Sequence, residues 1–146
     1  MRLPVATLIA TLTLFGPAVA DGLTSYTTGL SFDDVTFGLE NAITNRGLLI
    51  DHVSHVGEML ERTRPDVGSD VVLFDKAEVY SFCSASLSRQ VMEADPMNIM
   101  FCPYDIFVSQ QTGATEVTIG FRSFPEGDMQ VIQDLLDGIV KEAIED

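Results

Sequence analysis

The sequence predicts an α+β fold: a single domain with a mostly antiparallel sheet and helices packed on one face. One reason is that strand-like segments alternate with amphipathic helical segments along the chain. A second is the strict alternation of polar and apolar residues over 116–122, which is typical of a strand with one buried and one wet face. A third is the turn at 110–113, which joins this strand to the preceding strand-like segment as in a hairpin.

The domain begins with a strand and a helix. Residues 23–30 are rich in Thr and have no helical period, which favours a strand. Ser31 is a typical helix N-cap, and Asp33 and Asp34 stand in the first turn, where carboxylates oppose the positive end of the helix dipole. Apolar residues then recur at helical spacing until Gly47, which predicts an amphipathic helix that ends there.

The next segments are shorter. Residues 48–53 predict a second strand, and residues 54–63 predict a short helix that is capped by Ser54 and stops before Pro65. The apolar run 71–74 is compatible with a strand or with a helical turn, because periodicity does not distinguish them over so short a run.

Three strands and two helices follow. Residues 77–83 carry β-branched and aromatic side chains, so we expect a strand, which leads into a helix that ends at Asp95-Pro96. Residues 98–108 predict another strand, with Pro103 at an edge or a bulge because proline has no N–H to donate. After the strand at 116–122, helical spacing of apolar residues predicts a final amphipathic helix. These residues are Ile132, Leu135, Leu136, Ile139 and Ala143.

Residues 1–20 have the features of a secretory signal peptide that is cleaved. Arg2 is the sole charge ahead of an apolar run, and Ala18-Val19-Ala20 has the small-x-small pattern of a cleavage site. The run is too short for a membrane span of about 20 residues, and no later stretch of that length is free of charge. We therefore expect a soluble, periplasmic or secreted protein whose single domain is 21–146.

The chain is strongly acidic, with 22 Asp and Glu against 8 Lys and Arg and a net charge of −14. This balance argues against nucleic acid and anionic membrane surfaces as partners, since both need basic patches that neutralise phosphates. A basic protein would be attracted instead. The charge also keeps an exported protein soluble, which is the simpler explanation.

Cys83 and Cys102 are the only cysteines. In an oxidising compartment the pair is a disulfide candidate, provided that the fold brings the two Cα atoms within about 7 Å. Two buried thiols are a further structural explanation. In the functional alternative, Cys83 stands at the start of a helix, whose dipole lowers its pKa, and Cys102 on the neighbouring strand is the resolving thiol. The spacing excludes a Cys-x-x-Cys dithiol.

His52, His55 and Met59 are candidate metal ligands. If the short helix begins at residue 54, His55 and Met59 share one of its faces. Imidazole, thioether and thiolate together suit copper or haem iron. Four sulfur ligands would add to them if the fold gathers them: Cys83, Cys102, Met97 and Met100. Surface histidines and Met used as core filler explain the same residues, so no cofactor is predicted and copper or haem is an alternative.

Four aromatic residues near the hairpin allow two interpretations. They are Tyr104, Phe107, Phe121 and Phe124. Aromatic side chains on paired strands usually build the core, which is the interpretation that we favour. On the wet face they would mark a ligand pocket or a dimer contact. The chain has no Gly-x-Ser-x-Gly elbow and no phosphate-cradling glycine motif, so no catalytic residue is assigned.

The cysteines stand in a characteristic order of motifs. Cys83 is placed at a predicted strand-to-helix turn, Ala94-Asp95-Pro96 ends that helix, and Cys102 follows. This order resembles the domain of unknown function 302 family, over about residues 25–125. The resemblance implies a compact α+β fold and self-association into a homodimer, and it brings no activity with it.

We therefore expect an exported, periplasmic small binding or accessory domain, leaning away from an enzyme, with Cys83 and Cys102 near its site. The first alternative is a thiol-dependent redox protein in which Cys83 attacks and Cys102 resolves. The second alternative is a copper- or haem-binding accessory protein. A basic protein or a second copy of the chain is the expected partner.

Overall fold

The structure, a computed structural model, describes residues 22–145, so the predicted signal peptide lies outside the described residues. Five strands form one antiparallel sheet in the order β1-β5-β4-β3-β2. The strands are β1 (Leu23–Thr28), β2 (Leu49–Ser54), β3 (Phe74–Cys83), β4 (Tyr104–Gln111) and β5 (Val117–Arg122). The helices are α1 (Phe32–Asn45), α2 (Val56–Thr63), α3 (Ala85–Ala94), the 3₁₀ helix η1 (Pro96–Phe101) and α4 (Gln130–Ala143).

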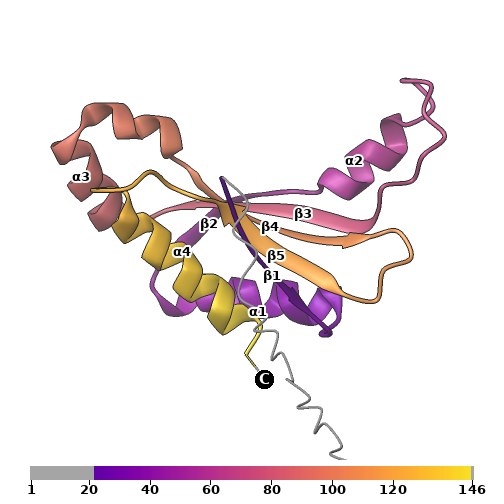
Figure 1. Cartoon of the computed structure of the whole chain (residues 1–146), viewed down its shortest axis with the longest axis horizontal. Coiled ribbons are helices and arrows are strands. Elements are labelled where there is room, and N and C mark those ends of the chain that lie inside the picture. Colours follow the sequence, from indigo (N-terminus) through magenta and orange to yellow (C-terminus); the bar gives the residue numbers. More distant parts are fainter. Residues whose placement is uncertain (1–21, 146) are drawn as a thin grey trace, which may run out of the picture.

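The helices are distributed unequally over the sheet. Figure 1 shows α1 and α4 side by side beneath it, whereas α3 and α2 lie at its two opposite ends. The predicted α+β class with an antiparallel sheet is confirmed. The unequal cover leaves much of the second sheet face without a helix above it; we call this the open face.

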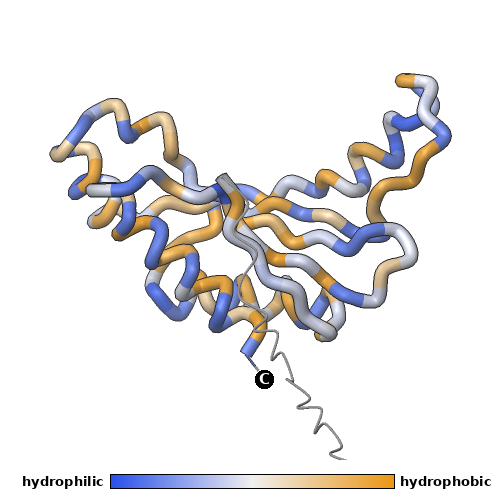
Figure 2. The backbone as a smooth tube through the Cα atoms, viewed as in Figure 1, coloured by the Kyte–Doolittle hydropathy of each residue, from blue (hydrophilic) through white to orange (hydrophobic). Residues whose placement is uncertain are grey.

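The core lies between the sheet and the α1–α4 layer. Alternate residues of β4 and β5 are fully buried on this side, and they meet the apolar faces of the two helices. The recurrence of hydrophobic residues along α4 is visible in Figure 2. The buried side chains of β4 and β5 are Tyr104, Ile106, Val108, Val117, Ile119 and Phe121.

Helix α1 forms as its sequence predicts. Ser31 is the N-cap, and its Oγ accepts a hydrogen bond from the backbone N–H of Asp34 at 3.1 Å. The helix ends at Asn45, and Gly47 adopts the left-handed conformation (φ +72°) that glycine allows. In mid-helix, Gly38 lies directly against the backbone of Ala143, so α1 and α4 approach closely at this point.

Helix α2 begins later than predicted. Ser54 is the last residue of β2, and the N-cap is His55, whose side chain makes no capping bond. The imidazole is engaged elsewhere, because its Nδ1 lies 3.0 Å from Oε1 of Glu78 on β3. Gly57 lets the helix lie directly on β3, since a Cβ there would come within 2.8 Å of the Ala77 nitrogen.

The apolar run 71–74, for which a strand or a helical turn was expected, forms neither over most of its length. Phe74 opens β3, while residues 71–73 lie outside any helix or strand and are exposed. Figure 2 shows this hydrophobic segment beside α2.

The prediction of a strand over 98–108 is wrong in its first half. Residues 96–101 form η1, because the Asp95 side chain caps it by accepting from the N–H of Met97 (2.9 Å). The Asn98 side chain, in turn, donates to the carbonyl of Val91 (2.8 Å), which ties η1 to α3. Strand β4 therefore starts at Tyr104, and Cys102 precedes the strand in which it was expected.

Within residues 22–145, no helix is long and apolar enough to span a membrane.

Candidate functional site on the open face of the sheet

A row of polar side chains crosses the open face. Strand pairing places His52 of β2 opposite Ser81 of β3, and Ser81 opposite Asp105 of β4. Arg122 of β5 lies one residue beyond the Ile106–Phe121 pair, which brings it beside Asp105. Because side chains alternate between the two faces of a strand, these residues point away from the buried core.

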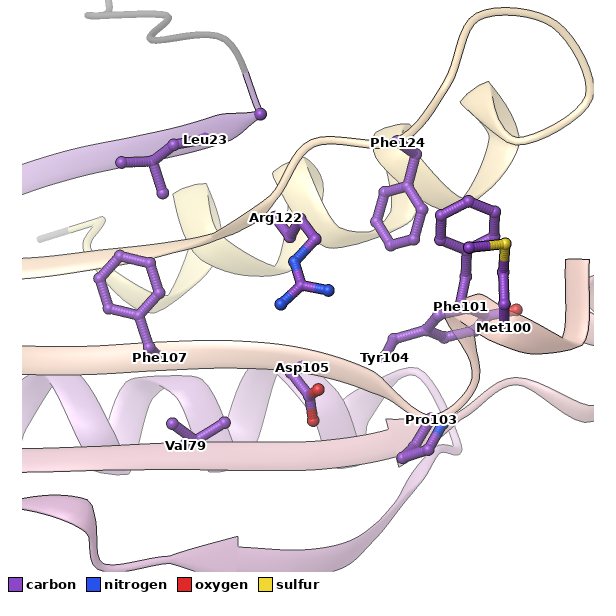
Figure 3. Close-up of a pocket in the computed structure, with 11 residues that line it drawn as sticks. Leu23, Val79, Met100, Phe101, Pro103, Tyr104, Asp105, Phe107, Arg122 and Phe124 are labelled. Atoms are coloured by element: carbon purple, nitrogen blue, oxygen red, sulfur yellow. The ribbon is translucent and has the colours of Figure 1, made fainter.

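A pocket of about 400 Å³ lies over this row, at the β4–β5 end. Its volume is within the range of small-molecule sites. Apolar side chains surround two charged ones, as Figure 3 shows. The lining residues are Gly22, Leu23, Val79, Met100, Phe101, Pro103, Tyr104, Asp105, Phe107, Arg122 and Phe124.

Arg122 occupies the middle of the pocket. Its guanidinium lies between Phe107 and Phe124 (Figure 3). In the described part of the chain, Arg122 and Arg62 are the only Lys or Arg side chains without a carboxylate within 4.0 Å. An unpaired guanidinium is unexpected in a chain with 22 acidic residues, so its five N–H donors are available to a ligand.

Asp105 is the second charge of the pocket. Its Oδ1 accepts a short hydrogen bond of 2.5 Å from the Ser81 hydroxyl, which holds the carboxylate on the β3 side. Arg122 and Asp105 are exposed, and they form no ion pair with each other.

The four aromatic residues divide between core and pocket. Tyr104 and Phe121 are buried, as the favoured interpretation predicts, whereas Phe107 is on the open face. Phe124 follows β5 and packs edge-on against Tyr104, with ring centroids 5.9 Å apart. Three of the four, Tyr104, Phe107 and Phe124, thus line the pocket, and Tyr104 belongs to the core as well.

Helix α4 positions Phe124. The Phe124 N–H donates to Oε1 of Gln133 at 2.9 Å, and Nε2 of Gln130 donates to the Phe124 carbonyl at 3.2 Å. On the other side of β4, the Tyr104 and Ser88 hydroxyls share a buried hydrogen bond of 2.9 Å, which joins β4 to α3. The pocket wall is therefore anchored to two helices.

Cys83 and Cys102 lie next to this wall. Cys83 is the last residue of β3, and Cys102 stands between two pocket residues, Phe101 and Pro103. Both thiols are free and half-buried. Burial, followed by the influence of the neighbouring Cys102 thiol, raises the pKa of Cys83 to about 12. Strand pairing supports this proximity, because Phe82 of β3 is paired with Tyr104 of β4, so Cys83 lies beside the residues that lead into β4.

The raised pKa is opposite to the direction expected of an activated thiol. The N-cap of α3 is Ser84, whose hydroxyl accepts from the Leu87 N–H, so Cys83 stands one residue outside the helix. Desolvation is the largest influence on the pKa of Cys83, and it raises that pKa.

The predicted metal ligands gather at a different place. His52, His55 and Met59 line one hollow where β2 meets α2. The bond from His55 to Glu78 holds it near the middle of β3, away from Cys83 at the end of that strand. Among residues 22–145, no three His, Cys, Asp or Glu side chains are grouped to hold a metal ion. Copper or haem binding stays a prediction.

Comparisons with known proteins agree with the fold. The family model described as Domain of unknown function DUF302 matches residues 24–143. The chain belongs to this family. It is also similar to a solved DUF302 structure, that of an uncharacterised conserved protein from Bacillus stearothermophilus. The TM-score is 0.58 and the identity 18%, over 85% of this chain and 88% of that chain, which supports a shared fold. No curated protein matches the chain.

The charged centre of this DUF302 site was missed by reasoning from the sequence. The alternation over 116–122 predicts a wet Arg122, since it places Phe121 on the buried face. The same pattern exposes Asp105 between Tyr104 and Ile106. The sequence therefore indicates that Arg122 and Asp105 are exposed. That the two side chains lie close together depends on the pairing of β4 with β5.

Proposed function

We propose that this DUF302 protein is an exported ligand-binding domain whose pocket on the open face takes a small organic acid with an apolar body. The observation that carries the proposal is Arg122, an unpaired guanidinium among aromatic side chains in a strongly acidic protein. A ligand carboxylate pairs with the guanidinium, and an apolar body contacts the rings of Phe107 and Phe124. Support for export comes from the signal-like residues 1–20.

The acidic surface does not itself attract an organic acid, so attraction is confined to the pocket. Long-range repulsion by a net charge of −14 slows the approach of any anion, so the local guanidinium has to supply the attraction. Apolar contacts then add affinity that is independent of charge.

Binding of anilinonaphthalene sulfonate, a fluorescent aromatic anion, tests the proposal. We expect saturable binding to the mature protein, and Arg122→Gln should weaken it by about tenfold because the charge-assisted hydrogen bonds are lost. Arg62→Gln is the matched control, since Arg62 is also unpaired but lies in α2, away from the pocket. Unfolding midpoints of the three proteins should agree.

Equal weakening by both substitutions would mean that only net charge matters, and the proposal would be wrong. The same conclusion would follow if neither this probe nor a simple aromatic carboxylate such as phenylpropionate bound at all.

The thiol pair supports a second candidate function, a thiol-dependent redox protein. The adjacency of Cys83 and Cys102 favours it, whereas the raised pKa of Cys83 leaves little thiolate at neutral pH. The pocket favours a binding domain, and the raised pKa of Cys83 argues against a reactive thiol. We therefore prefer the binding domain. A basic protein or a second copy of the chain is the partner that the acidic surface and the open face would suit.

A further inference from the structure

We infer that the ligand of the pocket is a zwitterion, namely an α-amino acid with an apolar side chain. The inference rests on the proposed function and deepens it. It comes from the two opposite charges, Arg122 and Asp105, which stand side by side in the pocket without neutralising each other.

The placement of the two charges follows from strand pairing. Ile106 of β4 is paired with Phe121 of β5, so Asp105 and Arg122 are the next residues along, on the opposite face of the sheet. Figure 3 shows the guanidinium extending from β5 towards β4, with the Asp105 carboxylate beyond it on β4. Both residues line the same pocket, so one small molecule can contact both.

The two charges are kept apart by their neighbours. The Ser81 hydroxyl binds Oδ1 of Asp105 and draws the carboxylate towards β3, away from β5. The guanidinium lies between the rings of Phe107 and Phe124. Arg122 therefore has donors for a carboxylate, and the second oxygen of Asp105 is left as an acceptor for an ammonium group.

A ligand with a single charge would satisfy one group and be repelled by the other. A simple carboxylate at Arg122 would lie near the negative Asp105, and a simple amine at Asp105 would lie near the positive Arg122. An α-amino acid carries both groups on one carbon, with the charges in the complementary order. Its side chain would then contact the apolar wall that Val79, Leu23 and Phe107 form on one side of the pocket.

Three ligands of nearly the same shape separate these contributions: phenylalanine, phenylpropionate and phenylethylamine. They share the phenyl ring and differ in whether they carry the carboxylate, the ammonium group or both. Calorimetric titration of the mature protein should give phenylalanine the highest affinity, by about tenfold or more over each of the other two.

Two conservative substitutions assign the charges to the two residues. Arg122→Gln should weaken phenylalanine and phenylpropionate but not phenylethylamine. Asp105→Asn should weaken the binding of phenylalanine and phenylethylamine and leave that of phenylpropionate unchanged or tighter, because the negative charge is removed. The substitution keeps the local structure, since the asparagine oxygen still accepts a hydrogen bond from Ser81. Arg62→Gln and Asp134→Asn are exposed, charge-matched controls outside the pocket.

The outcomes distinguish this inference from the function on which it rests. Phenylpropionate binding as tightly as phenylalanine, with no effect of Asp105→Asn, would overturn the zwitterion and leave the organic-acid pocket intact. Binding of anilinonaphthalene sulfonate without any binding of phenylalanine would do the same. Failure of all four probes would reject the pocket itself. The reciprocal pattern of the two variants would support the inference.

Discussion

Cys83 illustrates how surroundings override a local motif at the scale of a residue. The sequence Cys83-Ser84 before a helix suggests a dipole-activated thiol, yet Ser84 takes the capping position and Cys83 remains in the strand. Desolvation and the adjacent Cys102 then raise the pKa of Cys83 to about 12. The thiol is therefore mostly protonated at any physiological pH.

Reduced Cys83 should alkylate slowly at neutral pH. With a pKa of about 12 against 9.0 for an ordinary thiol, its rate with iodoacetamide should be at least about a hundredfold below that of the unfolded chain at about pH 7. The rate should climb about tenfold per pH unit up to about pH 11, since the thiolate is the nucleophile. Peptide mass spectrometry separates Cys83 from Cys102 in the same sample.

The denatured protein in guanidinium chloride is the control, because there Cys83 loses its neighbours. Rapid labelling of folded Cys83 at about pH 6 would contradict the raised pKa and would favour the redox candidate instead.

Two glycines in helix interiors show how packing decides the role of a residue at the scale of elements. Gly38 in α1 lies against the Ala143 backbone of α4, where a Cβ would come within 3.1 Å of the Ala143 carbonyl carbon. Gly138 in α4 has only an end of the Arg46 side chain nearby, at 3.5 Å. One glycine is thus needed for close approach of two helices, and the other is not.

The same substitution should therefore have opposite effects at the two positions. Gly38→Ala should lower the free energy of unfolding by about 1–3 kcal/mol, since both backbones would have to move. Gly138→Ala should raise it by about 0.5–1 kcal/mol, because alanine is the better helix former. Urea unfolding followed by circular dichroism measures both. Similar changes of one sign would show that Gly38 is not a packing contact.

Capping explains which elements were predictable from sequence. Ser31 marks the start of α1 as expected, because its hydroxyl bonds the helix that follows directly. Ser54 fails as a cap, because β2 continues through it in its pairing with Val79 of β3. The composition of residues 98–108 predicts a strand, but the hydrogen bonds of the Asp95 and Asn98 side chains hold residues 96–101 in η1.

Several buried or hydrogen-bonded acids control the stability of the whole molecule at alkaline pH. The pKa of Tyr80 is raised by burial and by its bond to Glu78, and that of Tyr26 by burial and by Asp137. Burial also raises the pKa of Tyr104 and of Cys83. All four groups therefore keep their protons more tightly in the folded chain than in the unfolded chain.

Stability should accordingly fall as the pH rises. Below the unfolded pKa values, 9.0 for Cys83 and 10.0 for Tyr80, folded and unfolded chains bind the same protons and the contribution is complete. Above them the unfolded chain loses protons first, so the free energy of unfolding decreases with pH. Urea titrations between about pH 7.5 and about pH 11 should show a plateau followed by a decline.

Tyr80→Phe is the informative variant for this prediction, since it removes one of the four groups and should make the alkaline decline shallower. A free energy of unfolding that stays level up to about pH 11 would mean that these groups are not perturbed by folding.

The α+β class, the last helix, the hairpin pattern and the family could all be predicted from the sequence. The spacing of apolar residues and the helix caps indicate these features, because both depend on residues that are close together in the chain. Three features could be seen only in the folded chain: Arg122 stands beside Asp105, Cys83 lies near Cys102, and η1 takes the place of the first half of a predicted strand. Such proximities arise from strand register and from packing between distant segments, so no local pattern contains them.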